Sequence, residues 1–73
     1  MLTKEEIANA LQQNNNLSEG TDYNVMPKSK LSTVITLNAL NALIEKFGEE
    51  PLKEAHSAGV FNIVRSIDFD MEI

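Results

Sequence analysis

The chain has 73 residues, carries a formal net charge of −5 and contains no cysteine. A chain of this length forms a single domain, residues 1–73, and the lack of cysteine excludes disulfides, thiolate catalysis and cysteine-based zinc sites. Eleven acidic residues face only six Lys and Arg residues, so we do not expect DNA as a direct ligand, because phosphate binding depends on cations. No apolar run reaches the roughly 18 residues of a membrane span, and we expect a cytoplasmic protein without membrane contact.

A helix is predicted at residues 2–13. Thr3 and Glu6 have the spacing of a capping box, in which the two side chains satisfy the exposed backbone N–H groups of the first turn. Ile7 and Leu11 lie four residues apart and therefore share one face of this helix. The stretch thus predicts a short amphipathic helix of about three turns.

Residues 14–31 are rich in turn-forming residues and predict a long loop. Tyr23 and Val25 can form one short extended piece within it. Lys28 and Lys30 are the only local pair of cations in the loop, and we interpret them as solvated rather than as a nucleic-acid contact. This region is expected to contribute least to the core.

Residues 32–47 give the strongest helical pattern of the chain. The apolar stripe expected to face the core has helical spacing and comprises Leu37, Leu40, Ile44 and Phe47. Gly48 is placed as the C-terminal cap. Either Ser32 or Thr36 can cap the N-terminus; Ser32 is preferred, although the β-branched run 33–36 could be extended before the helix begins.

Residues 50–58 predict a further helix, with Pro51 at its first position and Gly59 as its stop. The next segment, 60–67, fits two periods. Apolar side chains recur at helical spacing, but most of them also share the parity of a strand. We expect a helix to about residue 67, followed by the extended tail 68–73.

The two helices expected at 50–58 and 60–67 resemble the helix-turn-helix of the Cro and repressor family. The resemblance rests on Ala55 and Gly59, which have the spacing of the small residue and the turn glycine. It implies that Asn62 and Arg65 could contact bases. However, Arg65 stands where the family has an apolar core residue, and acids follow directly, so the hairpin could instead be plain core or a protein-binding descendant of the fold.

The tail alternates apolar and acidic residues from Ile67 to Ile73. Phe69 and Met71 share its apolar face. Such a segment can add a strand to the sheet edge of a partner; it could also cover this domain's own core, or pair with residues 23–26.

No residue pattern indicates catalysis. His56 is the only histidine and has no second histidine or any cysteine beside it, so we interpret it as an exposed helical residue rather than a metal ligand. We expect no catalytic, cofactor or metal site, and no enzyme activity.

Taken as a whole, from MLTKEEIANALQQNNN to DFDMEI, the chain resembles the small regulators that lytic phages, Xanthomonas phages among them, encode to bind host RNA polymerase. The resemblance implies binding to the polymerase in the bacterial host cell, with obstruction of initiation or suppression of termination.

The sequence therefore predicts a mainly α domain of three to four helices, with a degenerate helix-turn-helix-like hairpin and an extended C-terminal tail or short strand. The predicted function is that of a protein-binding transcription regulator. The alternatives are a DNA-binding repressor that uses residues 60–67 and a structural component of a phage particle. The residues expected to contact the partner are Glu49, Glu50, Glu54, Asn62, Arg65, Phe69 and Met71.

Overall fold

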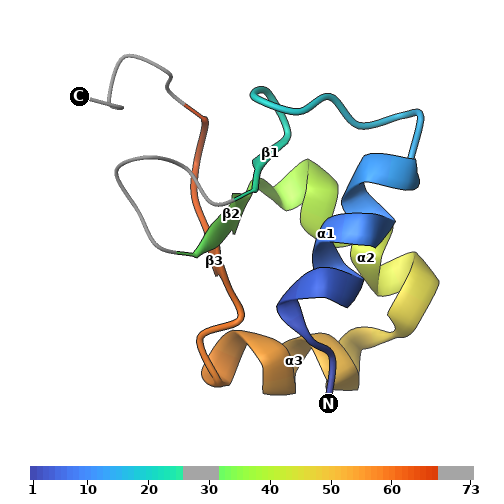
Figure 1. The fold of residues 1–73 in the computed structure, drawn as a ribbon, viewed down its shortest axis with the longest axis vertical. Coiled ribbons are helices and arrows are strands. Elements are labelled where there is room, and N and C mark those ends of the chain that lie inside the picture. The colour runs from blue at the N-terminus through green and yellow to red at the C-terminus, as the bar shows by residue number, and fades with distance from the viewer. Residues whose placement is uncertain (26–31, 68–73) are drawn as a thin grey trace.

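A small mixed sheet and the helices that cover it make up the protein (Figure 1). The computed structural model describes residues 1–25 and 32–67. In chain order the elements are α1 (Lys4–Gln13), β1 (Tyr23–Asn24), β2 (Thr33–Ile35), α2 (Leu37–Phe47), α3 (Glu49–Ser57) and β3 (Phe61–Ile63). The predicted mainly α fold is therefore wrong, because the described residues form an α/β fold whose sheet joins segments far apart in the sequence.

The strand order in the sheet is β1-β2-β3. Strand β1 is antiparallel to β2, with Tyr23 opposite Ile35, and β3 is parallel to β2, with Phe61 opposite Thr33. Parallel neighbours cannot be joined by a tight turn, so the chain crosses over between them. Helices α2 and α3 form that crossover.

Helix α1 begins as the sequence predicts. The Thr3 backbone N–H donates to Glu6 Oε1 at 2.8 Å, and the Glu6 backbone N–H donates to Thr3 Oγ1 at 3.1 Å, which completes the capping box. Ile7, Ala10 and Leu11 are its buried residues. This helix therefore has one apolar face, which packs against α2 and the sheet.

The start of α2 differs from the preferred prediction. Residues 33–35 are extended in β2, and Thr36, rather than Ser32, is the N-terminal cap. The Thr36 hydroxyl does not cap the helix but donates to the backbone carbonyl of Asp22 at 3.0 Å, and the Thr36 N–H donates to the same oxygen at 2.9 Å. The β-branched run thus favours a strand, and the loop before β1 is tied to the first turn of α2.

The connection between α2 and α3 consists of one residue, Gly48, with φ of 97°. Its N–H donates to the Ile44 carbonyl at 2.8 Å, so it is the C-terminal cap that the sequence predicts. Helix α3 starts at Glu49, which places Pro51 at the third helical position instead of the first. The helix ends at Ser57, close to the predicted boundary.

The predicted helix at 60–67 is wrong, because residues 61–63 form strand β3. The apolar residues Val60, Ile63 and Val64 have helical spacing, but a run this short does not distinguish a helix from a short strand flanked by irregular backbone. As a strand, this segment pairs its backbone with β2, which would otherwise lack a neighbour on that side. Pairing of distant segments, rather than local periodicity, decides the structure here.

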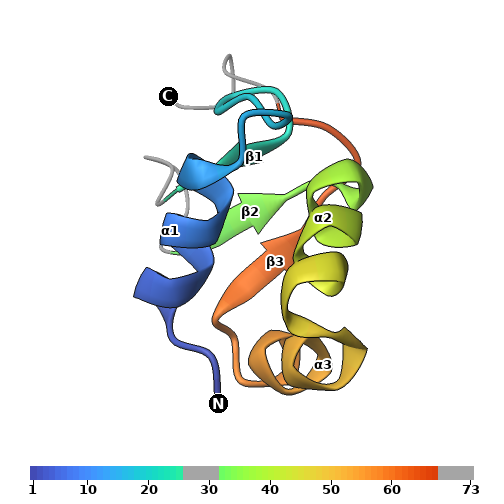
Figure 2. The same ribbon diagram turned by 90° about the vertical axis from the view of Figure 1, so that its right-hand side faces the viewer.

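One hydrophobic core lies between the sheet and the helices. Helices α1 and α2 lie against one face of the sheet, and α3 lies at one end (Figure 2). The core consists of Ile7, Ala10, Leu11, Tyr23, Ile35, Ala39, Leu43, Leu52, Ala55, Val60 and Phe61. Within residues 1–25 and 32–67, none of the helices is long and apolar enough to span a bilayer.

Candidate protein-binding surface

The residues predicted to contact a partner separate into three groups. Glu49, Glu50 and Glu54 are exposed on α3. Asn62 is exposed on β3, and Arg65 is exposed just after this strand. The remaining two, Phe69 and Met71, lie outside the described residues, as do Lys28 and Lys30.

Asn62 and Arg65 do not project from a recognition helix. The Asn62 side chain donates from Nδ2 to the Ser32 hydroxyl across the sheet. Strand β3 is only three residues long and comes last in the described strand order, and Arg65 follows it. Neither side chain therefore lies on a helix that could enter a major groove. The interpretation of residues 60–67 as a DNA-reading helix is therefore wrong.

Two adjoining hollows lie along β3, and Ile63 lines both. The first, of about 120 Å³, lies between β3 and the α2–α3 pair. The second, of about 560 Å³, extends past the start of α2 toward Arg65. We call the two hollows together the β3 groove and define it by its apolar residues, which are Leu37, Leu40, Ile44, Leu52, Phe61, Ile63 and Val64.

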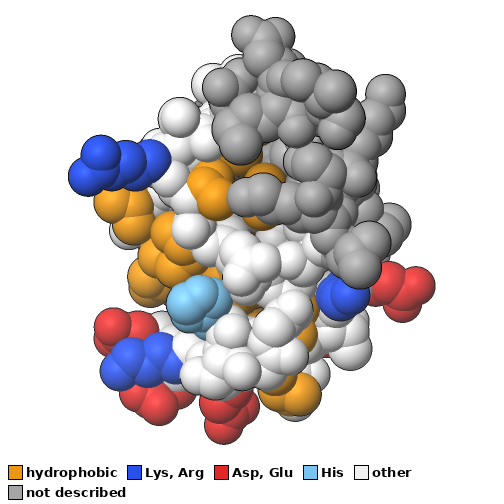
Figure 3. All heavy atoms as spheres, turned by 90° about the vertical axis from the view of Figure 1, so that its left-hand side faces the viewer, with side chains coloured by type: hydrophobic (Ala, Val, Ile, Leu, Met, Phe, Trp, Pro, Cys, Tyr) orange, Lys and Arg blue, Asp and Glu red, His pale blue; other side chains and the backbone are white. Residues whose placement is uncertain are grey.

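Two of the three exposed large hydrophobic side chains in the described part of the chain line the β3 groove. Among the described residues, the exposed large hydrophobic side chains are Met1, Leu37 and Ile63. Leu37 is 63% exposed and Ile63 is 37% exposed, and both line the wider hollow. Single exposed apolar residues are ordinary, but adjacent ones beside a polar rim are typical of an interaction site. Figure 3 shows hydrophobic side chains gathered on this face beside the chain's single histidine.

Helix α2 supplies the groove because it is apolar over a wide arc. Ala39 and Leu43 are its buried residues, whereas Leu40 and Ile44 are only partly buried. The stripe that the sequence predicts to face the core therefore lies largely beside β3, with Leu37 at its exposed end. Sequence reasoning missed Leu37 and Ile63 as surface residues; the signal was an apolar arc on α2 wider than one packed face requires.

Charged groups form the rim of the groove. Glu49 and Lys53 line its α3 end, and Asp22 and Arg65 line its other end. The imidazole of His56 stacks on Phe61, with ring centroids 5.4 Å apart. The predicted contacts Glu49 and Arg65 are thus brought to one surface, although from opposite ends.

The helical pair beside the groove is predominantly acidic. Its exposed charged residues, excluding His56, are Glu45, Lys46, Glu49, Glu50, Lys53 and Glu54. Four carboxylates minus two ammonium groups leave a local charge of −2. Glu49 and Lys53, which line the groove itself, balance each other, so attraction of a cationic segment would come from the net charge of the helical pair as a whole.

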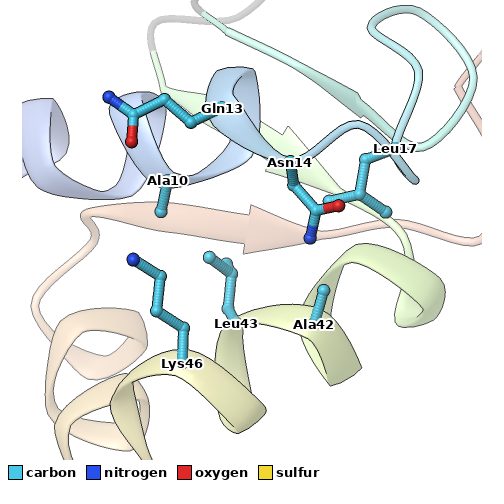
Figure 4. A pocket seen from close by; sticks show the side chains of 7 residues that line it. All are labelled: Ala10, Gln13, Asn14, Leu17, Ala42, Leu43 and Lys46. Atoms are coloured by element: carbon cyan, nitrogen blue, oxygen red, sulfur yellow. The ribbon is translucent and has the colours of Figure 1, made fainter.

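A separate hollow of about 230 Å³ lies between α1 and α2 (Figure 4). Ala10 of α1 and Leu43 of α2 line it from opposite sides, and its polar groups include Asn14 and Lys46. Ligand pockets usually measure roughly 300–1,000 Å³, so this hollow is small for an organic ligand. It also lacks the exposed apolar side chains of the β3 groove, which is the better candidate site.

The described residues contain no group of three or more His, Cys, Asp or Glu side chains that could hold a metal ion. His56 is exposed on α3, as predicted, with its ring against Phe61. Comparisons with protein-family models, with curated proteins and with solved structures find no match to this chain.

Proposed function

We propose that this protein is a transcription regulator that binds bacterial RNA polymerase through the β3 groove and thereby obstructs initiation or suppresses termination. The observation that carries the proposal of protein binding is that Leu37, 63% exposed, and Ile63, 37% exposed, line one hollow beside the start of α2. The polymerase is the proposed target because the sequence resembles small phage regulators of that enzyme. The regulator would act by occupying a surface that other factors need.

The apolar residues of the groove can supply part of the binding energy. Fully burying an aliphatic side chain contributes about 1.5–3 kcal/mol, and Leu37 still has 63% of its surface to bury. With Ile63, the gain is roughly 1.5–3 kcal/mol before the costs of association. That suits a hot spot within a larger contact, while the carboxylates of α3 increase the rate of encounter with a basic surface.

Binding of the tagged protein to purified bacterial RNA polymerase tests the proposal directly. Leu37→Glu places a carboxylate in the groove, and we expect at least about a tenfold weaker affinity, which corresponds to 1.4 kcal/mol. Asn9→Glu is the matched control, because it adds the same charge at an exposed position of α1 away from the groove. Affinity is measured by biolayer interferometry with immobilised protein.

Several outcomes would contradict the proposal. Absence of binding to both the polymerase core and holoenzyme would remove the proposed target. Equal losses from Leu37→Glu and Asn9→Glu would remove the groove from the interface. Binding to duplex DNA at 50 mM salt that fades steeply by about 200 mM would indicate phosphate contacts instead. A large oligomer in light scattering would favour a structural role in an assembly.

A further inference from the structure

The two edges of the sheet differ in how they are covered. At the β1 edge, Glu19 forms a bridge with Tyr23, and the Gly20 N–H donates to the Tyr23 carbonyl at 2.6 Å. The chain thus covers this edge with its own preceding loop. Strand β3 forms the opposite edge, and no described strand lies beyond it. An edge strand without a cover is a template for pairing with another chain.

The register identifies the backbone groups that point outward from β3. In a parallel ladder, successive residues direct their N–H and C=O groups to opposite sides. The Val64 N–H donates to the Ile35 carbonyl at 2.8 Å, so Val64 and Asn62 face β2. Phe61 and Ile63 therefore direct their backbone donors and acceptors to the edge beyond which no strand lies among residues 1–25 and 32–67.

The β3 groove lies beside this same edge. A strand added there would run about 4.8 Å from β3, with alternate side chains on the two faces of the sheet. Those on the helical face would meet Leu40 and Ile44, which line the narrower hollow together with Phe61 and Ile63. An extended segment could thus both pair its backbone with β3 and bury apolar side chains in the groove. A helix lying in the groove could bury side chains but could not pair its backbone with the strand.

Charge determines what should flank the apolar residues of that segment. Strand β3 begins beside α3, where Glu49 and Lys53 both line the groove, while the α2–α3 pair as a whole carries a net charge of −2. A Lys or Arg side chain on the segment, next to the position opposite Phe61, would be attracted to this end. A segment with carboxylates in place of these cations would lack this attraction to the helical pair.

We propose that β3 accepts an extended peptide of the partner protein as a fourth strand of the sheet. The peptide pairs its backbone with Phe61 and Ile63, directs alternate apolar side chains into the β3 groove, and carries a cationic residue at the α3 end. This proposal rests on the proposed function, because it specifies how the same groove is used.

The test uses the full 15N-labelled chain and the synthetic peptide acetyl-KVTVTVK-amide, followed by NMR. Pairing should slow the amide hydrogen exchange of Phe61 and Ile63 by at least about tenfold, while Asn62 and Val64, which already bond to β2, change little. Two further versions of this peptide carry N-methyl groups at alternate residues, and each blocks the N–H groups that point to one side of the strand. Only the version that blocks the N–H groups facing β3 should lose pairing. The acidic analogue acetyl-EVTVTVE-amide should bind at least about tenfold more weakly.

A pair of variants tests the edge from the protein's side. Ile63→Pro removes an outward N–H that the ladder does not use, so proline is tolerated there as at other sheet edges. Ile63→Ala shortens the side chain but keeps this N–H. We expect Ile63→Pro to abolish the slowed exchange at Phe61 and Ile63→Ala to retain it, with unchanged circular dichroism as the check of folding.

Equal binding of both N-methylated peptides, or protection of Tyr23 and Asn24 instead of Phe61 and Ile63, overturns the inference. Polymerase binding without any pairing of β3 overturns it too and leaves the proposed function intact. Pairing of the peptide without polymerase binding supports the inference and overturns the proposed target. The N-methylated peptides keep the test valid even where a protein variant fails to fold.

Discussion

Helix α2 borders two regions of the molecule that use the same kind of residue differently. On the packed side, toward α1 and the sheet, Leu43 is 2% exposed. On the groove side, Leu37 of the same helix is 63% exposed. Strand β3 repeats the contrast, with Phe61 at 1% and Ile63 at 37% exposure. Apolar residues on the packed side stabilise the domain, whereas those along the groove leave surface for a partner, so stability and binding should respond to different substitutions.

The largest expected effect is the difference between two leucine substitutions in α2. Leu43→Ala leaves a cavity in the core and should reduce the free energy of unfolding by about 2–5 kcal/mol. Leu37→Ala, at a strongly exposed position, should change it by less than about 0.5 kcal/mol. For a domain of 73 residues, whose total stability is roughly 4–11 kcal/mol, the first change is severe. Urea denaturation measures both, and similar losses would show that the groove side belongs to the core.

Gly48 links the two regions, because it fixes how α3 follows α2. At its φ of 97° and ψ of 160°, a side chain is strained even where space is free. The nearest atom to an added Cβ is Pro51 Cδ at 3.8 Å, an ordinary contact, so the cost of Gly48→Ala is conformational, about 1–3 kcal/mol. We also expect weaker partner binding, since α3 supplies one wall of the groove.

Asn41→Ala is the control for this glycine, because Asn41 is exposed within α2 and alanine favours the helix. Its free energy of unfolding should stay equal or rise by a few tenths of a kcal/mol. Urea denaturation measures the free energy of unfolding of both variants. An equal decrease in Gly48→Ala and Asn41→Ala would show that the backbone angle at Gly48 does not cause the loss of stability.

Local signals allowed the helical part of the fold to be predicted from the sequence. The capping box of Thr3 and Glu6 and the glycine stop at Gly48 act over a few residues and need no tertiary partner. Strand β3 could not be predicted in this way. Its partner in the sheet, Thr33, precedes Phe61 by 28 residues, and apolar residues near Phe61 have spacings that fit a helix as well as a strand.

Of the residues of the β3 groove, only the charged ones at its rim could be predicted from the sequence. Glu49 and Arg65 were identified because charged residues indicate an exposed surface in any fold. Leu37 and Ile63 were not, because an apolar side chain becomes a surface feature only when the tertiary structure leaves it uncovered. Phe69 and Met71 stay predictions, since they lie outside the described residues.

Helix α1 contributes to the packed side alone, so its cap should affect stability without affecting the groove. Thr3→Ala removes the acceptor for the Glu6 N–H and should cost about 1 kcal/mol. Glu6→Gln is the control, because glutamine also completes a capping box. Partner affinity, corrected for the folded fraction, should be unchanged in both variants. A specific loss of affinity with Thr3→Ala would place α1 in the interface.

The smallest effect concerns Tyr23, on the packed side, and emerges only at high pH. Burial, followed by the charges of Glu19 and Asp22, raises the pKa of this phenol above its usual value of 10.0. The folded protein therefore holds the phenolic proton more tightly than the unfolded chain. The stability from this group is fully present below pH 10 and is lost as the pH rises from there through the folded pKa.

Tyr23→Phe removes this contribution, so the variant should lose less stability than the parent between about pH 9 and 11, measured by urea denaturation at each pH. Lysine titration contributes equally to both proteins and cancels in the difference; identical pH profiles would mean that the Tyr23 hydroxyl is as solvated in the folded protein as in the unfolded chain.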